Sequence, residues 1–124
     1  MILVDTSVWI GHLRRTDPHL VELLEAGEVV THPMVIGELA CGTLPERESF
    51  LRLLSLLPAA PVASDAEALG FIESERLMGR GIGYVDVHVL ASARLGGETR
   101  LWTADARLAA AARRLFVGYD PRAG

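Results

Sequence analysis

The sequence predicts an α/β fold in which a central parallel sheet of about five strands is covered by helices on both faces. Short apolar runs alternate along the chain with longer segments of helical periodicity, which is the order of a parallel sheet with crossover helices. The run at residues 2–4 is apolar throughout, as in a central strand buried on both faces. With 124 residues, 50% of them hydrophobic, the chain can build one core. We therefore expect a single domain over residues 1–124.

Local signals place the other elements in order along the chain. Asp17 before Pro18 is typical of a helix N-terminus, Ser64 and Glu67 match a capping box, and Gly27 ends a helix. The predicted helices cover residues 8–15, 18–26, 34–41, 46–57, 65–78, 84–95 and 105–115, and the other predicted strands cover 29–31, 61–63, 100–103 and 116–119.

The charged residues exclude several mechanisms, because all 12 basic residues are arginine and the chain has no lysine. A P-loop, Schiff-base chemistry and the lysine that commonly accompanies a phosphoacceptor aspartate are therefore absent. The net charge of −4 argues against indiscriminate binding to nucleic acid. It leaves open a nucleic-acid enzyme whose acidic residues hold divalent metal ions, since bound dications would offset that charge.

Neither cysteine chemistry nor a membrane span is predicted. Cys41 is the only cysteine, and its neighbours Leu39 and Ala40 predict a packed thiol. The longest apolar stretch, residues 53–63, is interrupted by serine and proline and is too short to cross a bilayer. The N-terminus also lacks a leader pattern. We therefore expect a cytoplasmic protein that does not bind a membrane.

Four of the 16 acidic residues stand at positions where a solvated carboxylate is unexpected. Each shares a strand end or a helix stripe with apolar residues, and a buried carboxylate is costly unless it is paired or binds a cation. Two follow predicted strands and two lie near helix starts, so all four can converge at the carboxyl edge of the sheet. These residues are Asp5, Glu38, Asp86 and Asp105.

Converging carboxylates without His or Cys suit Mg²⁺ or Mn²⁺, and such a pocket favours phosphoryl chemistry. For any one of these acids alone, a helix cap or a solvated carboxylate is the more common role. The sequence therefore points to a metal site through the set of acids and through none of them individually.

The same residues carry a resemblance to a known family. The chain reads ILVDTS at residues 2–7, VIGEL at 35–39 and TAD at 103–105, and Asp86 precedes an apolar helix face. In this order the segments resemble the PIN-domain ribonucleases over nearly the whole chain. The chain length, and a Glu38 helix that ends in glycine, are similar to the VapC-type toxins of toxin–antitoxin pairs. The resemblance implies a five-stranded parallel sheet and metal-dependent RNA cleavage at an acidic cluster of Asp5, Glu38, Asp86 and Asp105, with Ser7 and Thr103 as supporting hydroxyls.

On this basis we expect an endoribonuclease that hydrolyses an RNA phosphodiester with a metal-activated water, and Mg²⁺ or Mn²⁺ as its cofactor. The expected metal ligands are Asp5, Asp86 and Asp105. Glu38 is expected to bind a metal directly or to orient a bound water. Phosphate contacts are expected from arginines that flank the predicted loops, namely Arg14, Arg15, Arg76 and Arg80.

Two protein contacts are expected besides the RNA substrate. One is a cognate VapB-type antitoxin, which is expected to place an arginine against the acidic pocket. The other is a homodimer contact, because a mean hydropathy of +0.29 is high for a soluble chain of this size and predicts apolar surface that a partner covers. The alanine-rich helix and residues 53–57 are the expected contact regions.

Other interpretations share parts of this pattern. A receiver-like phosphoacceptor domain also has an acidic Mg²⁺ pocket, but here lysine is missing and Asp5 stands alone rather than in a pair. A haloacid-dehalogenase-like phosphatase needs Asp-x-Asp after the first strand, where this chain has aspartate, threonine and serine. A flap-nuclease relative would carry additional helical elements. His88, two residues after Asp86, is expected to pack or to be exposed rather than to contact substrate.

Overall fold

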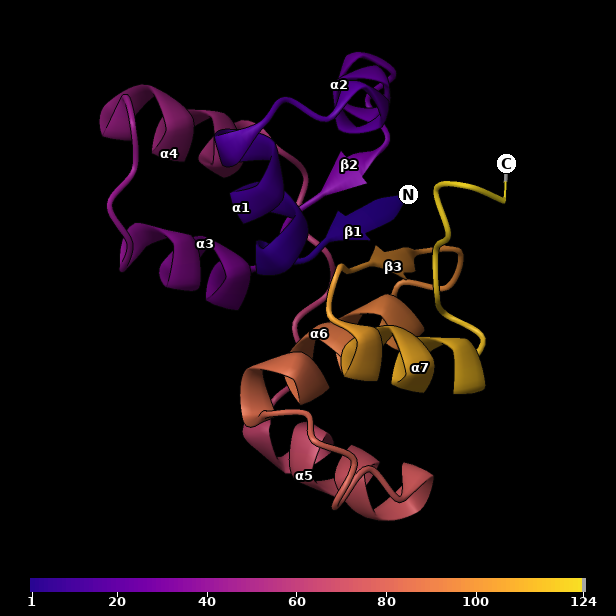
Figure 1. The fold of residues 1–124 in the computed structure, drawn as a ribbon. Coiled ribbons are helices and arrows are strands. Elements are labelled where there is room, and N and C mark those ends of the chain that lie inside the picture. Colours follow the sequence, from indigo (N-terminus) through magenta and orange to yellow (C-terminus); the bar gives the residue numbers. More distant parts are fainter. Residues whose placement is uncertain (124) are drawn as a thin grey trace.

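The computed structural model describes residues 1–123, and a three-stranded parallel sheet lies at its centre (Figure 1). The strands β1 (Ile2–Val4), β2 (Val29–Val30) and β3 (Arg100–Trp102) have the order β2-β1-β3. Leu3 pairs with Val30 on one side and with Leu101 on the other. All residues of β1 are buried, which confirms the prediction of a central strand covered on both faces.

The prediction of about five strands was wrong, because the sheet has three strands within residues 1–123. A single bridge extends each edge, and the two bridging pairs are Thr31 with Ala59 and Leu101 with Gly118. At this bridge the Thr31 N–H donates to the carbonyl of Pro58 and the Ala60 N–H donates to the carbonyl of Thr31. The next donors in the ladder would be the nitrogens of Pro58 and Pro33, which carry no hydrogen, so pairing stops and no strand forms at 61–63. At the other edge Phe116 has a left-handed backbone with a φ of 60°, so the extended segment begins only after it.

All seven predicted helices are present in the described part of the chain, with ends shifted by three residues at most. In Figure 1 the first four lie together above and to the left of the strands, and the last three lie below. Their bounds are α1 (Thr6–Arg14), α2 (Pro18–Glu25), α3 (Pro33–Ala40), α4 (Arg47–Leu56), α5 (Asp65–Glu75), α6 (Tyr84–Leu95) and α7 (Ala106–Arg114).

Two helix starts are capped as the sequence predicts. Asp17 Oδ1 accepts hydrogen bonds from the backbone N–H groups of His19 and Leu20, so it caps α2. Ser64 Oγ accepts from the N–H of Glu67, and Glu67 Oε1 accepts from the N–H of Ser64, which completes the capping box of α5. These local bonds fix where both helices begin.

The core lies between the sheet and the helices on either side, with Leu3, Trp9 and Leu90 fully buried. Cys41 is exposed, so the prediction of a packed thiol was wrong. The reason is that α3 ends at Ala40 and buries Val35 and Leu39, while Cys41 is the residue that follows its last turn. In the described part of the chain, every helix is too short or too polar to span a membrane.

Candidate active site

Asp5 lies at the exact point where β1 gives way to α1, and its side chain is only 6% exposed. Its backbone N–H donates to the carbonyl of Trp102 at 2.9 Å, which extends the pairing of β1 with β3. Its carboxylate does not cap α1. Instead Oδ2 accepts hydrogen bonds from Ser7 Oγ at 2.7 Å and Thr103 Oγ1 at 2.8 Å.

The two hydroxyls join the β1–α1 turn to the β3–α7 turn. Ser7 Oγ accepts from the N–H of Ala104 at 3.0 Å, and Thr103 Oγ1 accepts from the N–H of Asp105 at 3.1 Å. The two oxygens are 3.2 Å apart. Because each hydroxyl has one proton and donates it to Asp5, this contact adds no third hydrogen bond. Ser7 and Thr103 thus hold the Asp5 carboxylate from two chain segments.

Asp86 lies in the first turn of α6, where its Oδ2 accepts a hydrogen bond from the N–H of Gly83 at 3.0 Å. Burial raises the pKa of this carboxyl above its ordinary value, and the Gly83 N–H opposes the rise. The negative charges of Asp5, Asp105 and Glu38 raise the pKa further. The other three acids therefore lie near enough to Asp86 for their charges to act on it.

Glu38 and Asp105 are exposed, so the expectation that all four acids share buried apolar stripes was wrong. Glu38 Oε1 accepts from Thr6 Oγ1 at 2.8 Å, which ties α3 to the start of α1. Asp105 Oδ1 accepts from the N–H groups of Arg107 and Leu108 and caps α7. Both side chains are therefore accessible to water.

The donor set fits Mg²⁺ or Mn²⁺, because it consists of carboxylate and hydroxyl oxygens without sulfur or imidazole. Among residues 1–123, however, no three acidic, His or Cys side chains are grouped closely enough to hold a metal ion. Each carboxylate is bonded to a neighbouring N–H or O–H group. The donor atoms are therefore chemically suited to a cation, and the side chains would have to move closer to one another to bind it.

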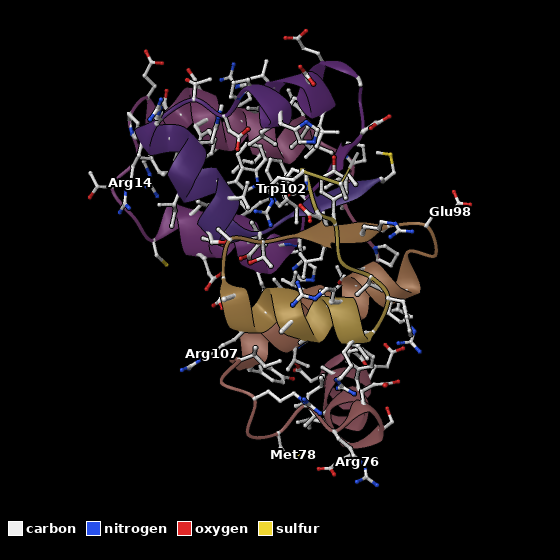
Figure 2. The ribbon with its side chains drawn as sticks, turned by 45° about the vertical axis from the view of Figure 1, so that its right-hand side comes forward. Arg14, Arg76, Met78, Glu98, Trp102 and Arg107 are labelled. Carbon is white, nitrogen blue, oxygen red and sulfur yellow. The ribbon has the colours of Figure 1, made fainter. Side chains whose placement is uncertain are left out.

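The four arginines expected to contact phosphate lie in different places. Arg15 lines a groove together with Ser7, whereas Arg14 lines a separate pocket with Glu38. Arg80 Nε donates to the carbonyl of Arg76 at 2.7 Å. Figure 2 shows Arg76 at the far end of the molecule from Trp102, the last residue of β3.

Arg107 is a residue that the sequence analysis missed. A Cβ at Gly81 would lie 2.6 Å from Arg107 Cδ, so the Arg107 side chain rests directly on the loop that precedes α6 (Figure 2). Gly81 has a φ of +76°, which also favours glycine. Arg107 thus connects the start of α7 to the loop before Asp86. Its place two residues after Asp105 was the available sequence signal.

His88 lies in the core and is only 2% exposed, so it is packed, which is one of the two expected roles. Its Nε2 is 3.2 Å from Asp65 Oδ1, which also accepts a hydrogen bond from the Tyr84 hydroxyl at 2.8 Å. The Tyr84 ring packs edge-on against the imidazole. These contacts fasten the first turns of α6 to the start of α5.

Comparisons with known proteins agree with this architecture. The family model described as the PIN domain matches residues 2–114. Ribonuclease VapC32 of Mycobacterium tuberculosis strain CDC 1551 / Oshkosh is 52% identical over 111 residues, which cover 90% of this chain and 90% of that protein. Ribonuclease VapC32 of strain ATCC 25618 / H37Rv matches with the same identity and coverage. The chain therefore belongs to the PIN-domain family, and to the VapC branch of it.

Proposed function

We propose that this protein is a metal-dependent endoribonuclease, the toxin of a toxin–antitoxin pair, which hydrolyses RNA phosphodiester bonds with an activated water. The observation that supports this most is the geometry at Asp5, whose carboxylate joins the β1–α1 and β3–α7 turns through Ser7 and Thr103. The charges of Asp5, Asp105 and Glu38 also act on Asp86. The relatives named ribonuclease VapC32 support RNA as the substrate.

In this proposal Asp5, Asp86 and Asp105 hold the metal, and Glu38 binds it directly or orients a bound water. Bound Mg²⁺ or Mn²⁺ would lower the pKa of a water and offset charge on the phosphate oxygens. Ser7 and Thr103 fix Asp5 through their two hydrogen bonds. No protein nucleophile is needed. Arg14 and Arg15 remain the proposed phosphate contacts at the site, because they line pockets with Glu38 and Ser7. Arg76 and Arg80 are proposed to contact phosphates only farther along the RNA, since Arg76 lies far from Trp102 and Arg80 donates to Arg76. Arg107, which rests on the loop before α6, is added to the proposed contacts.

The receiver-like alternative gains no support from the structure. The chain has no lysine, and its family is that of the PIN domains. Incubation with acetyl phosphate and Mg²⁺ separates the two functions, because a receiver would form a phosphoaspartate at Asp5 and the proposed nuclease would not.

The purified protein, freed of any antitoxin, is expected to cleave structured RNA in Mg²⁺ or Mn²⁺ and to leave 5′-phosphate ends, because water is the attacking group. Cleavage is followed on gels, and the ends are identified by their susceptibility to a 5′-phosphate-dependent exonuclease. Undiminished cleavage in EDTA would contradict the proposal. So would cyclic-phosphate products, because they require attack by the RNA 2′-hydroxyl.

The proposed partners are a VapB-type antitoxin and a second copy of the chain, which would cover exposed apolar side chains. Leu56 on α4 is 77% exposed and Leu53 is 41% exposed, whereas α7 already buries Leu108, Ala111 and Ala112 in the core. The structure thus makes α4 the better candidate of the two contact regions.

Leu56→Glu is expected to convert a dimer at micromolar concentration into a monomer, because it places a charge in the proposed contact. Leu69→Glu is the matched control, since Leu69 is a similarly exposed leucine on α5. Light scattering coupled to gel filtration measures the mass of each variant. A parent protein that is monomeric at this concentration would contradict the proposed dimer.

A further inference from the structure

A groove of about 440 Å³ adjoins the acidic cluster through Ser7, which lines the groove and donates to Asp5. Its volume is within the range of about 300–1,000 Å³ typical of ligand sites. At one end lie Ser7, which holds Asp5, and Ala104, which is bonded to Ser7. Its other lining includes Gly11, His12, Arg15 and Trp102.

Among the side chains that line this groove, His12 and Arg15 can donate hydrogen bonds to a phosphate. His12 Nδ1 accepts a hydrogen bond from the N–H of Asp17 at 3.0 Å, so the neutral ring carries its proton on Nε2. Nε2 has no partner within residues 1–123 and is not among the buried unpaired nitrogens. The second donor is the exposed guanidinium of Arg15, which binds phosphate well.

One acidic residue also lines the groove. Asp17 lines the groove, but its Oδ1 is engaged by two backbone N–H groups as the cap of α2. Its own N–H is the group that orients His12. The α1–α2 turn therefore fixes the direction of the imidazole and leaves a neutral donor and a cation beside the catalytic acids.

We infer that this groove binds the RNA strand next to the cleaved bond, with a phosphate held by His12 Nε2–H and the Arg15 guanidinium. The inference rests on the proposed function and adds a binding path that leads away from Asp5 along α1. The occupant is a polyanion because the groove offers hydrogen-bond donors and one cation, and because it ends at a site suited to phosphoryl transfer.

Binding to a fluorescein-labelled single-stranded RNA is measured by fluorescence anisotropy, with Asp86→Asn in all proteins to prevent cleavage. His12→Gln keeps a donor near the Nε2 position, whereas His12→Asn keeps an acceptor for the Asp17 N–H and loses the donor in the groove. If His12 binds RNA in the groove, His12→Asn should weaken RNA binding by about tenfold and His12→Gln should keep most of the parental affinity. A structural role predicts the reverse, with binding and melting temperature preserved by Asn.

Arg15→Ala is expected to weaken binding and to reduce the slope of log affinity against log salt by about 0.7, the value for one phosphate contact on a single strand. Arg100→Ala is the matched control, because Arg100 is an exposed arginine at the opposite end of β3. Equal losses from both changes would show nonspecific electrostatics and overturn the inference.

Gly11 allows a test that does not weaken the fold. A Cβ at Gly11 meets no atom within 4 Å, so the first side-chain atom of Gly11→Met has room at the groove that Gly11 lines. Helix propensity predicts an equal or higher melting temperature, while the filled groove predicts at least tenfold weaker RNA binding. Unchanged binding would overturn the inference. If the parent protein cleaves RNA while every groove variant binds it normally, only the groove is wrong; if the parent cleaves no RNA, the proposed function itself fails.

Discussion

Asp5→Asn is expected to lower RNA cleavage by about 10³-fold, since a lost metal ligand removes several kcal/mol of transition-state stabilisation. The amide has nearly the shape of the carboxylate, but only its oxygen can accept a hydrogen bond. Ser7 and Thr103 both donate to the same carboxylate oxygen, so the amide oxygen can preserve these bonds and the local fold. The measurement is the single-turnover rate on a labelled RNA at saturating Mg²⁺.

Asp120→Asn is the matched control, because Asp120 is an exposed aspartate paired with Arg122 and is not one of the four acids of the cluster. It should cleave at the parental rate. The supporting residues supply a graded test, because Ser7→Ala and Thr103→Val each remove one hydrogen bond to Asp5. Each should raise the Mg²⁺ concentration for half-maximal cleavage by about 10- to 100-fold. If Asp5→Asn cleaved RNA as fast as the control, Asp5 would have no place in the site.

The helices could be predicted from the sequence because their signals are local. The partners of a cap lie within three residues of it, as Ser64 and Glu67 do, and no distant contact is needed to form the bond. Asp5 could be predicted for a related reason. A strand apolar at every position must be central, and the residue that ends it must lie at the carboxyl edge of the sheet.

The remaining features depend on distant partners and so could not be predicted. Ala59 pairs with Thr31 in a single bridge, and proline prevents this bridge from becoming a strand. The contact of Arg107 with Gly81 joins segments that the sequence places 26 residues apart, and only the packing of α7 beside the loop reveals it. For Asp105 the sequence allows two roles, a helix cap and a member of the acidic cluster. The structure gives it the capping bonds and also a charge that acts on Asp86.

Asp86→Asn is expected to separate stability from activity. In EDTA near neutral pH, burial and the charges of Asp5, Asp105 and Glu38 disfavour an ionised Asp86, as its raised pKa records. The asparagine oxygen can still accept the hydrogen bond from Gly83, but the charge is gone. The variant should therefore melt at the same or a higher temperature than the parent in EDTA and yet have little nuclease activity.

The dependence on pH follows from the same shift. A carboxyl whose pKa is higher in the folded than in the unfolded state binds its proton more tightly when folded, so its contribution to stability is present at low pH. That contribution is lost as the pH rises from the ordinary value of 3.8 through the raised value of Asp86. The parent should lose this contribution over that window and Asp86→Asn should not. Glu67→Gln is a control whose effect on the pH dependence of stability has the opposite sign. The hydrogen bonds with Ser64 lower the pKa of Glu67, so its charged form stabilises the fold.

Mg²⁺ completes the test, because an ion that binds only the folded state stabilises it by mass action. At about 100 times its dissociation constant it adds about 2.7 kcal/mol to the parent's free energy of unfolding. For a chain of this size that corresponds to a rise of roughly 10 °C in melting temperature. Asp86→Asn should gain much less, since one of the proposed ligands is missing. A variant less stable than the parent in EDTA that nevertheless gained as much from Mg²⁺ would show that Asp86 only caps α6, and the proposed metal site would be wrong.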